Sequence, residues 1–315
     1  MSVDVSVIVC THNRAEMLGE TLASWRDVDR RGLNVELMVV DNASGDATPD
    51  IVARFQPCCA VTRYVRESVP GLSRARNRGI REAHGEIIAF VDDDVFFHRD
   101  WLQILMRAFR ERTEVSCVGG NSIPRFEGHR PEWLAEPMLT YYGSTQSGDR
   151  DRLMTFPEHP FGVNMAFRRQ VFERVGWFRT NLGRTGASLL SNEERELFYR
   201  IAHAGINVWY AADAIIYHRI PADRMSQAWL IRRAYWQGIS KVVFDAHTRR
   251  PSRIDLGRDA VIALKRLALG SGHRDPGSIV RYHRRRDLGE RLKRSQWLGT
   301  ARQSLVEIFR GSAPR

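Results

Sequence analysis

The chain has 315 residues, of which 43% are hydrophobic, so it can bury the core of one large domain or of a domain with an appendage. No uncharged apolar run of about 18 residues occurs, and the amino-terminal residues do not resemble a secretory signal, so we expect no membrane-spanning segment. The four cysteines lack the spacing of a zinc site, and we expect reduced thiols in a cytoplasmic protein.

The positive charge of the chain is concentrated near its carboxyl terminus. Residues 219–315 hold 22 Lys+Arg and 8 Asp+Glu, a net of +14, whereas the net charge of the whole chain is +11 and that of residues 1–218 is therefore −3. A basic segment attracts polyanions such as nucleic acid or an anionic membrane surface. We therefore expect two parts with different tasks, a body at 1–218 and a basic extension at 219–315.

Short β-rich runs alternate with helical patterns over the first 130 residues. The predicted strands cover 3–9, 35–41, 61–67 and 86–92. The predicted helices cover 14–25, a segment from 48, 72–84 and about 100–112. This alternation predicts an α/β fold with a doubly wound, mostly parallel sheet, in which ligands bind beyond the carboxyl ends of the strands.

Polar residues follow three of these strands and are expected to meet at one edge of the sheet. They are Thr11, His12, Asn13 and Arg14 after the first strand, Asp41, Asn42 and Ser44 after the second, and Asp92, Asp93 and Asp94 after the fourth. Neither GxGxxG nor GxxxxGK[ST] follows the first strand, so a dehydrogenase or a P-loop enzyme loses its main support.

Three consecutive carboxylates at the end of a buried strand repel one another unless a cation or hydrogen-bond donors offset their charge. Alternation places Asp92 and Asp94 on one side and Asp93 on the other. Two oxygen ligands suit Mg²⁺ or Mn²⁺ bound to a nucleoside diphosphate, but a turn at the start of the next helix explains an isolated triplet equally well. Arginines of the helix at 72–84 would meet a diphosphate or form a solvated face.

A second acidic group lies in SNEERELFYRIAHAG, residues 191–205, which predicts a helix with Asn192 as its N-cap. Glu193 and Glu194 fall in its first turn, where the helix dipole favours ionised carboxylates, so helix stabilisation competes with a catalytic role. His218 ends the strand AIIYH, and a structural histidine is as consistent with this position as a ligand.

Taken in order over residues 3–218, the motifs VSVIVCTHNR, VVDNASGD, GLSRARNRGIREAHGEIIAFVDDDV, GVNMAFRR and NEERELFYRIAHAG resemble the family 2 glycosyltransferases, which are inverting enzymes of the GT-A fold. The resemblance implies a donor site for a nucleoside-diphosphate sugar. Its residues are expected to be Thr11, Asn13, Arg14, Asp41, Arg76, Asn77, Asp92 and Asp93. The divalent metal is expected at Asp92 and Asp94, the DxD-type element, with His218 close by.

The resemblance also implies the catalytic base. Glu194 stands where the family usually has aspartate, so it is the expected base. Glu193 is the alternative, because glutamate is one methylene longer than aspartate and its carboxylate therefore lies at a different distance from the acceptor hydroxyl. One base is enough for inversion, since the acceptor hydroxyl loses a proton as it attacks the anomeric carbon opposite the leaving diphosphate. A double-displacement glycosidase would need two carboxylates flanking the sugar.

After residue 219 helical spacing replaces the βα alternation, with helices expected at 226–247, 258–270 and 281–309. Their mixture of Trp, Leu, Arg and Lys is typical of helices that lie on anionic lipid, and equally of helices that pack on the body with solvated charges. Because relatives use lipid-linked or nascent saccharide acceptors, the resemblance favours peripheral attachment at the inner face of the plasma membrane.

Two other classes of protein stay open. A sugar nucleotidyltransferase shares the sheet type and the metal carboxylates. A nucleic-acid-binding protein would use the basic run RYHRRR at 281–286. Nucleic acid is the less favoured partner, because the excess charge is confined to the extension and no RRM, OB or zinc-finger signature appears.

Overall fold

The computed structural model describes residues 2–59, 61–186, 188–249, 251–269 and 283–310. These fall into two compact units. Unit 1 comprises 1–125, 142–181 and 193–220, and unit 2 comprises 126–141, 182–192 and 221–315. The break after Ile220 lies close to the expected boundary at 218, but two earlier segments also belong to unit 2. The basic run at 281–286 begins outside the described residues, and its side chains are not among those described.

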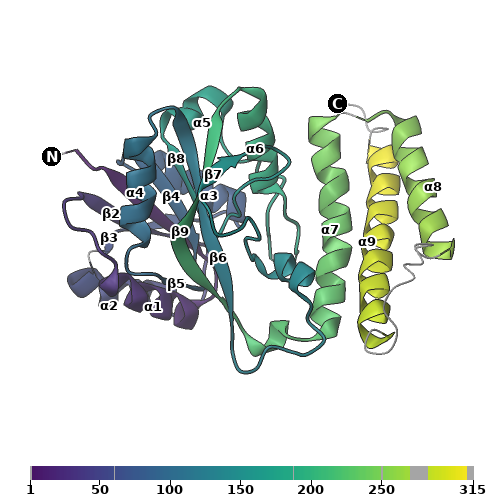
Figure 1. The fold of residues 1–315 in the computed structure, drawn as a ribbon, viewed down its shortest axis with the longest axis horizontal. Coiled ribbons are helices and arrows are strands. Elements are labelled where there is room, and N and C mark those ends of the chain that lie inside the picture. The colour runs from purple at the N-terminus through teal and green to yellow at the C-terminus, as the bar shows by residue number, and fades with distance from the viewer. Residues whose placement is uncertain (1, 60, 187, 250, 270–282, 311–315) are drawn as a thin grey trace. The chain divides into compact units, whose positions relative to one another are not determined.

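Unit 1 contains a nine-stranded sheet with the order β3-β2-β1-β4-β8-β6-β9-β5, and β7 pairs with β9 (Figure 1). The strands are β1 (Val5–Thr11), β2 (Val35–Asn42), β3 (Val61–Glu67), β4 (Ile87–Asp92), β5 (Val95–Phe97), β6 (Val115–Phe126), β7 (Arg152–Met154), β8 (Asn164–Arg168) and β9 (Asn207–Ile220). Strands β1 to β4 pair in parallel, which confirms the predicted doubly wound part. The pairs β4–β8, β6–β8, β5–β9 and β7–β9 are antiparallel, an arrangement that the alternation of strands and helices did not predict.

Helices cover both faces of this sheet. They are α1 (Ala15–Ser24), α2 (Thr48–Cys59), α3 (Leu72–Glu82), α4 (Trp101–Glu111), α5 (Gln170–Val175) and α6 (Glu193–His203). Alternate residues of β1 point to opposite faces, so Val7 belongs to one hydrophobic cluster and Ile8 to another. The first cluster includes residues of α1, α2 and α4, and the second includes residues of α3, α5 and α6. Burial on both faces explains why the parallel strands are almost continuously apolar.

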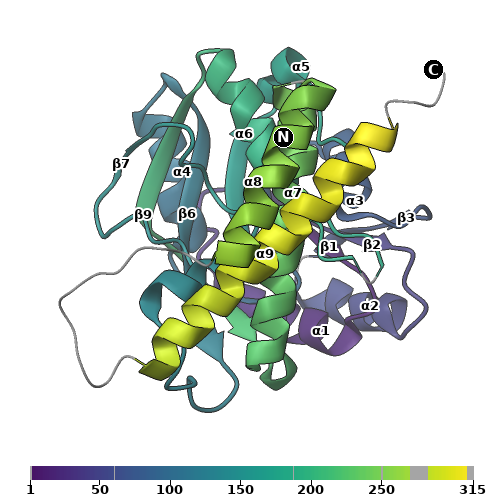
Figure 2. The same ribbon diagram turned by 90° about the vertical axis from the view of Figure 1, so that its right-hand side faces the viewer.

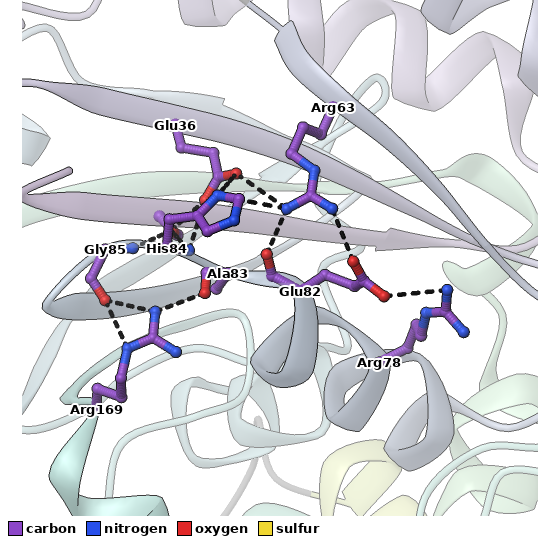
Figure 3. A network of polar contacts seen from close by, with 9 residues as sticks. Glu36, Arg63, Arg78, Glu82, Ala83, His84, Gly85 and Arg169 are labelled. Carbon is purple, nitrogen blue, oxygen red and sulfur yellow. Dashed lines mark hydrogen bonds and ion pairs between the residues drawn. The ribbon is translucent and has the colours of Figure 1, made fainter. Parts of the chain in front are cut away.

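A polar network joins the starts of the central strands, at the edge opposite the carboxyl ends of the strands (Figure 3). Glu36 of β2 accepts a hydrogen bond from the Ser6 hydroxyl of β1 at 2.5 Å and from the His84 backbone amide at 3.0 Å. Arg169, which follows β8, donates to the backbone carbonyls of Ala83 and Gly85. The connection between α3 and β4 is therefore held from two sides. This connection sets the position of β4 relative to α3.

We expect Glu36→Gln to lower the free energy of unfolding by about 1–3 kcal/mol at pH 7, because the amide cannot accept all the hydrogen bonds of the buried carboxylate. Burial alone would raise the pKa of Glu36, but hydrogen bonds from Ser6 and His84 outweigh burial and hold this pKa below its usual value. A carboxyl group with a lowered folded-state pKa stabilises the protein above its unfolded pKa, and this stabilisation is lost as the pH falls through the folded pKa.

The measurement is urea denaturation of wild type and Glu36→Gln between pH 7 and pH 3, with the difference in unfolding free energy shrinking as the pH falls. Glu82→Gln is the matched control, because Glu82 forms ion pairs with Arg63 and Arg78 at a site where its side chain is 26% exposed. The control is expected to cost less than about 1 kcal/mol. Equal losses in the two variants would contradict the role given to the Glu36 network.

Unit 2 contains three long helices, α7 (Gln227–Thr248), α8 (Arg253–Leu269) and α9 (His283–Arg310), and α9 lies between α7 and α8 (Figure 1). Close approach of α7 and α9 requires glycine at their crossing. A Cβ atom on Gly238 would lie 1.9 Å from the Gln296 carbonyl oxygen, and one on Gly299 would lie 2.0 Å from that of Tyr235. Within the described residues, no helix has an apolar stretch sufficient to cross a bilayer.

Helix α6 begins directly after Asn192, the residue predicted as its N-cap, but the backbone of Asn192 is unusual for that position. Its φ is 76°, in the left-handed region, whereas an N-cap residue normally has an extended backbone. The Asn192 side chain, which belongs to unit 2, accepts a hydrogen bond through Oδ1 from Gln237 Nε2 of α7 at 3.2 Å. Asparagine tolerates this left-handed conformation, which the pattern of residues alone does not predict.

Candidate active site

The register of the parallel strands brings the three sets of polar residues to one edge of the sheet. Thr11 of β1 lies opposite Asp41 of β2, and Cys10 lies opposite Asp92 of β4. The expected convergence of these residues is therefore confirmed. Strand β4 ends at Asp92, and Asp93 and Asp94 form the turn before β5. Asp93 and Asp94 are buried, so their carboxylates do not point into bulk solvent.

Arg14, at the start of α1, offsets much of the charge of this triplet. Its Nη1 atom donates to Asp93 Oδ1 at 2.9 Å and to Asp94 Oδ2 at 2.8 Å. The Thr11 hydroxyl donates to Asp93 Oδ2 at 2.7 Å. Burial raises the pKa of Asp93; the charge of Arg14 opposes this rise and that of Asp94 adds to it. Arg14 and Thr11 thus hold Asp93 in place, whereas Asp92 and the Oδ1 atom of Asp94 face a different neighbour.

That neighbour is His218 of β9. One oxygen each of Asp92 and Asp94 and a ring nitrogen of His218 all lie within 4.8 Å of one another. His218 Nδ1 lies 2.6 Å from the Tyr142 carbonyl oxygen, so Nδ1 carries a proton and donates it, while Nε2 lies 3.2 Å from Asp94 Oδ1. Two carboxylates and an imidazole oriented by a carbonyl match the ligands of a divalent metal. These three residues therefore form a group that could hold a metal ion.

The buried side chain of Arg76, from α3, links this group to α6. Its Nη1 atom donates to Glu193 Oε1 at 2.9 Å, and its Nη2 atom lies 3.6 Å from Asp92 Oδ1. The guanidinium also lies over the ring of Phe178, with 5.4 Å between its Cζ and the ring centroid. A Cβ on Gly162 would lie 2.4 Å from Arg76 Nη2, so only glycine leaves room for this arrangement. One cation therefore spans a carboxylate of the aspartate triplet and a carboxylate of α6.

Glu193 and Glu194 form an acid pair in the first turn of α6. The pKa of Glu193 is raised to about 7, because burial and the charge of Glu194 raise it more than Arg76 lowers it. In the described structure, the Oε2 atoms of both glutamates are buried without a hydrogen-bond partner. The third glutamate of this turn, Glu196, forms ion pairs with Arg179 and Arg200. Within the described residues, Glu193 and Glu194 therefore each keep one carboxylate oxygen without a hydrogen-bond partner, whereas both oxygens of Glu196 are engaged.

The loops after β1 and β2 are joined to each other beside the metal-ligating group. Asn13, with a φ of 52°, donates its backbone amide to the Ser44 hydroxyl at 3.0 Å, and its Oδ1 accepts from the Gly45 amide at 2.8 Å. Asp41 is fully buried; it accepts hydrogen bonds from the Ser44 amide at 2.8 Å and from the Tyr64 hydroxyl at 2.5 Å. Asp41 thus shapes the loop that borders the site.

Asn77 is the predicted site residue that the structure places apart from these groups. Its amide nitrogen donates to the Phe178 carbonyl at 2.8 Å, and its amide oxygen accepts from the Phe178 backbone amide at 3.0 Å. Both polar atoms are therefore engaged in fastening α3 to the segment before α6. The interpretation of the other arginines of α3 as a solvated face fits Arg74 and Arg81, which are exposed, whereas Arg78 is partly buried and forms an i,i+4 ion pair with Glu82.

Three features of the site had no clear signal in the sequence. Tyr64, which binds Asp41, lies in an ordinary β-rich run. Gly162 makes room for Arg76, a role that its neighbours in the sequence do not indicate. The Tyr142 carbonyl that orients His218 is a backbone atom, which no sequence motif marks. Of these, only Gly162 lies in one of the quoted motifs, GVNMAFRR, which contains the strand that begins at Asn164.

Comparison with known proteins identifies the class of enzyme to which this site belongs. Residues 6–176, more than half of the chain, match the model of the family described as Glycosyl transferase family 2. The protein therefore belongs to glycosyl transferase family 2 and is a glycosyltransferase, as the order of its motifs predicted.

The sequence identity of the chain to individual members named here is low. The chain is 29% identical to the glucosyl-dolichyl phosphate glucuronosyltransferase of Haloferax volcanii over 76% of this chain and 77% of that protein. It is 26% identical to the succinoglycan biosynthesis protein ExoM of Rhizobium meliloti over 74% and 72% of the two chains. These relatives have names that refer to glycolipid or polysaccharide synthesis.

Solved structures confirm the fold. The mannosyltransferase PcManGT from Pyrobaculum calidifontis, solved with GDP-Man and Mn²⁺, is 23% identical and has a TM-score of 0.62 over 98% of this chain and 88% of its own. Residues 1–349 of S. aureus TarS, solved with UDP, give a TM-score of 0.54 at 16% identity, over 97% and 92% of the two chains. The predicted GT-A fold with a helical carboxyl-terminal part is therefore correct.

Proposed function

We propose that this glycosyltransferase is metal-dependent and inverting, and that it moves a sugar from a nucleoside-diphosphate sugar to an acceptor hydroxyl. The observation that carries the proposal is the guanidinium of Arg76, which contacts both Asp92 of the metal-ligating group and Glu193 of the acid pair. Such a transfer needs one set of groups for the leaving diphosphate and another for the attacking hydroxyl. In unit 1 the metal-ligating group and the acid pair lie on either side of the Arg76 side chain.

The residues that would hold the metal are Asp92, Asp94 and His218. A bound Mg²⁺ or Mn²⁺ would supply positive charge that stabilises the departing diphosphate. The Mn²⁺ bound with GDP-Man by the mannosyltransferase of the same fold supports this assignment. Arg14 keeps its positive charge beside Asp93 and Asp94, since these carboxylates raise the pKa of its guanidinium. It therefore offsets repulsion within the triplet before any ligand binds.

Glu194 is the proposed general base. Glu193 is buried and bound to Arg76, whereas Glu194 is only partly buried and is the more accessible acid of the pair. One carboxylate that accepts the proton of the acceptor hydroxyl is sufficient for a direct displacement, which inverts the configuration at the anomeric carbon. Glu193 would then act as the partner that fixes Arg76 beside the leaving group.

We further propose that residues 1–218 are the catalytic domain, with the nucleotide beside the loops that carry Thr11, Asn13 and Asp41. The joined β1 and β2 loops at the carboxyl edge of the sheet support this position. A lipid-linked or nascent saccharide is the proposed acceptor, and the inner face of the plasma membrane the proposed place of action. The support is the dolichyl phosphate in the name of the Haloferax volcanii relative.

The test is a thermal-shift screen of UDP-, GDP- and dTDP-sugars with and without Mg²⁺ or Mn²⁺. At ligand concentrations of about 100 times Kd, binding stabilises the folded state by about 2.7 kcal/mol, which is measurable as a rise in Tm. We expect one nucleotide to raise Tm, and to do so more strongly with metal. Turnover of the best donor should release a nucleoside diphosphate and form the inverted anomer. Release of pyrophosphate from a nucleoside triphosphate would instead identify a nucleotidyltransferase.

A further inference from the structure

The exposed hydrophobic side chains of the protein are concentrated on two helices. Seven of the eleven large hydrophobic residues that are exposed in the described chain lie on α8 and α9. They are Ile254, Val261, Ile262 and Leu264 on α8 and Leu298, Leu305 and Phe309 on α9. Exposure reaches 82% at Ile254 and 73% at Phe309. Single exposed hydrophobic residues are common, but such a concentration marks an interaction surface.

On α8 two of these residues, Ile254 and Val261, share one face of the helix with cations. Ile254, Arg258, Val261 and Lys265 follow one another at spacings of four, three and four residues, so they form a single exposed stripe. The opposite face of α8 holds Leu256, Ala260 and Ala263, which are buried. The helix is therefore apolar on both faces, and packing within unit 2 uses only one of them.

Helix α9 has a stripe of the same kind. Its exposed positions Arg291, Arg294, Leu298, Arg302, Leu305 and Phe309 follow one another at spacings of three or four residues. In Figure 2 α8 and α9 lie in front of α7, and Figure 1 shows the same order from the side. Both stripes place aliphatic or aromatic side chains between positively charged ones, which is the composition of helices that lie in the headgroup region of a membrane.

We propose that these two stripes, which we call the α8–α9 face, bind the surface of an anionic phospholipid bilayer. The apolar side chains would enter the boundary between headgroups and acyl chains, and the arginines and lysine would contact lipid phosphates. The long cationic side chains suit this position because their aliphatic stems can stay among apolar groups while the charge reaches the headgroups. The net charge of +14 over residues 219–315 strengthens the attraction.

Two other occupants fit the face less well. A nucleic acid would pair with the cations, but it offers no apolar phase for residues such as Ile254 and Phe309, which it would leave in water. A second copy of the chain would bring the same cationic stripes against each other, and like charges in contact oppose association. An anionic bilayer satisfies both the charge and the apolar side chains.

Vesicle flotation of the full chain tests the proposal, without donor or metal, so its outcome is independent of the transferase assignment. We expect the protein to float with vesicles of phosphatidylcholine that contain about one third phosphatidylglycerol, and to stay unbound with phosphatidylcholine alone. Binding should weaken as NaCl rises from about 0.1 M to about 0.5 M. No flotation with the anionic vesicles, or equal flotation with both, would overturn the proposal.

Two variants separate the contributions of charge and apolar contact. The triple variant Arg291→Gln, Arg294→Gln, Arg302→Gln is expected to weaken partition about a hundredfold, at roughly fivefold for each basic residue. The double variant Ile254→Ser, Phe309→Ser is expected to weaken it at least about tenfold, through loss of buried apolar area. Circular dichroism should show an unchanged fold, because the replaced side chains are exposed.

The matched controls lie in unit 1. Arg99→Gln, Arg107→Gln, Arg110→Gln removes three exposed arginines, and Val69→Ser, Leu153→Ser removes two exposed apolar side chains. Both controls should bind vesicles like the wild type. If a control weakens binding as much as its counterpart, the α8–α9 face is not the binding surface. Concentration-dependent dimerisation that the α8–α9 variants abolish, without vesicle binding, would assign the face to a second copy instead.

Discussion

Replacing Glu194 with glutamine is expected to lower kcat by a factor of about a hundred to ten thousand, the usual contribution of a general base. Glutamine keeps the size of the side chain but cannot accept a proton from the attacking hydroxyl at neutral pH. Binding of the nucleotide with metal should stay within about twofold of the wild type, because the metal-ligating group belongs to β4, its following turn and β9. The measurements are steady-state kinetics and calorimetric titration of the same preparations.

Glu193→Gln is the matched comparison, because it removes the neighbouring carboxylate of the same helix turn. We expect a smaller loss of kcat together with a lower Tm, since Arg76 would keep its burial and lose its strongest partner. If Glu193→Gln abolishes turnover while Glu194→Gln retains it, the two roles are exchanged. If both variants turn over like the wild type, proton transfer lies elsewhere and the proposed mechanism fails.

The second large effect is expected for Asp94→Asn, which should weaken metal-dependent nucleotide binding by at least about tenfold to a hundredfold. Removing a group that only hydrogen-bonds to a metal ligand already lowers metal affinity by about tenfold to a hundredfold. Asp94 is proposed to bind the ion directly, so its loss should cost at least as much. The neutral amide is a poorer ligand for a hard cation than a carboxylate. It also removes the charge that lies 3.2 Å from His218 Nε2. Nucleotide titrations with and without Mn²⁺ measure the gain in nucleotide affinity that the metal produces.

Asp93→Asn is the control for this prediction, since it removes the same charge one residue away. Asp93 is held by Thr11 and Arg14 and is not one of the two aspartates that converge with His218. We expect Asp93→Asn to retain the gain in nucleotide affinity that metal produces. Wild-type affinity that is the same with and without Mn²⁺, or equal losses in the two variants, would remove the metal from the mechanism.

The parallel half of the sheet could be predicted closely from the sequence. The runs at 35–41 and 61–67 correspond to β2 (Val35–Asn42) and β3 (Val61–Glu67), within one residue. Strands buried on both faces are nearly continuous apolar runs, and helices between them have a different period, so local patterns are sufficient. The first strand was placed two residues early because Val3 extends the apolar alternation beyond the pairing with β2.

The antiparallel half was much less predictable. Strand β5 has only three residues, and β6 contains adjacent glycines and a proline, which weaken any strand pattern. The pairing of β5 with β9 sets Val95 opposite His218 and so brings this histidine beside Asp94. More than 120 residues of sequence separate Val95 from His218, and the spacing of residues in one strand says nothing about such a partner. Only the family resemblance had suggested that His218 lies near the metal.

Arg76 and Asn77 illustrate the same limit within one helix. Both were assigned to the donor site because they share a motif, yet Arg76 spans Asp92 and Glu193 while Asn77 binds the backbone of Phe178. Adjacent residues of a helix point about 100° apart, so they meet different neighbours. Which neighbour each one meets depends on where Gly162 and α6 lie in space.

By itself, the sequence determined the alternation of strands and helices, the polar residues that end each parallel strand, and the family to which the chain belongs. The tertiary structure alone decided that Arg14 and Thr11 hold Asp93, that Arg76 connects Asp92 with Glu193, and that His218 joins Asp92 and Asp94. The reason is physical. Periodic burial fixes local conformation within a few residues, whereas the partner of a buried charge is selected by strand register and helix packing over the whole of unit 1.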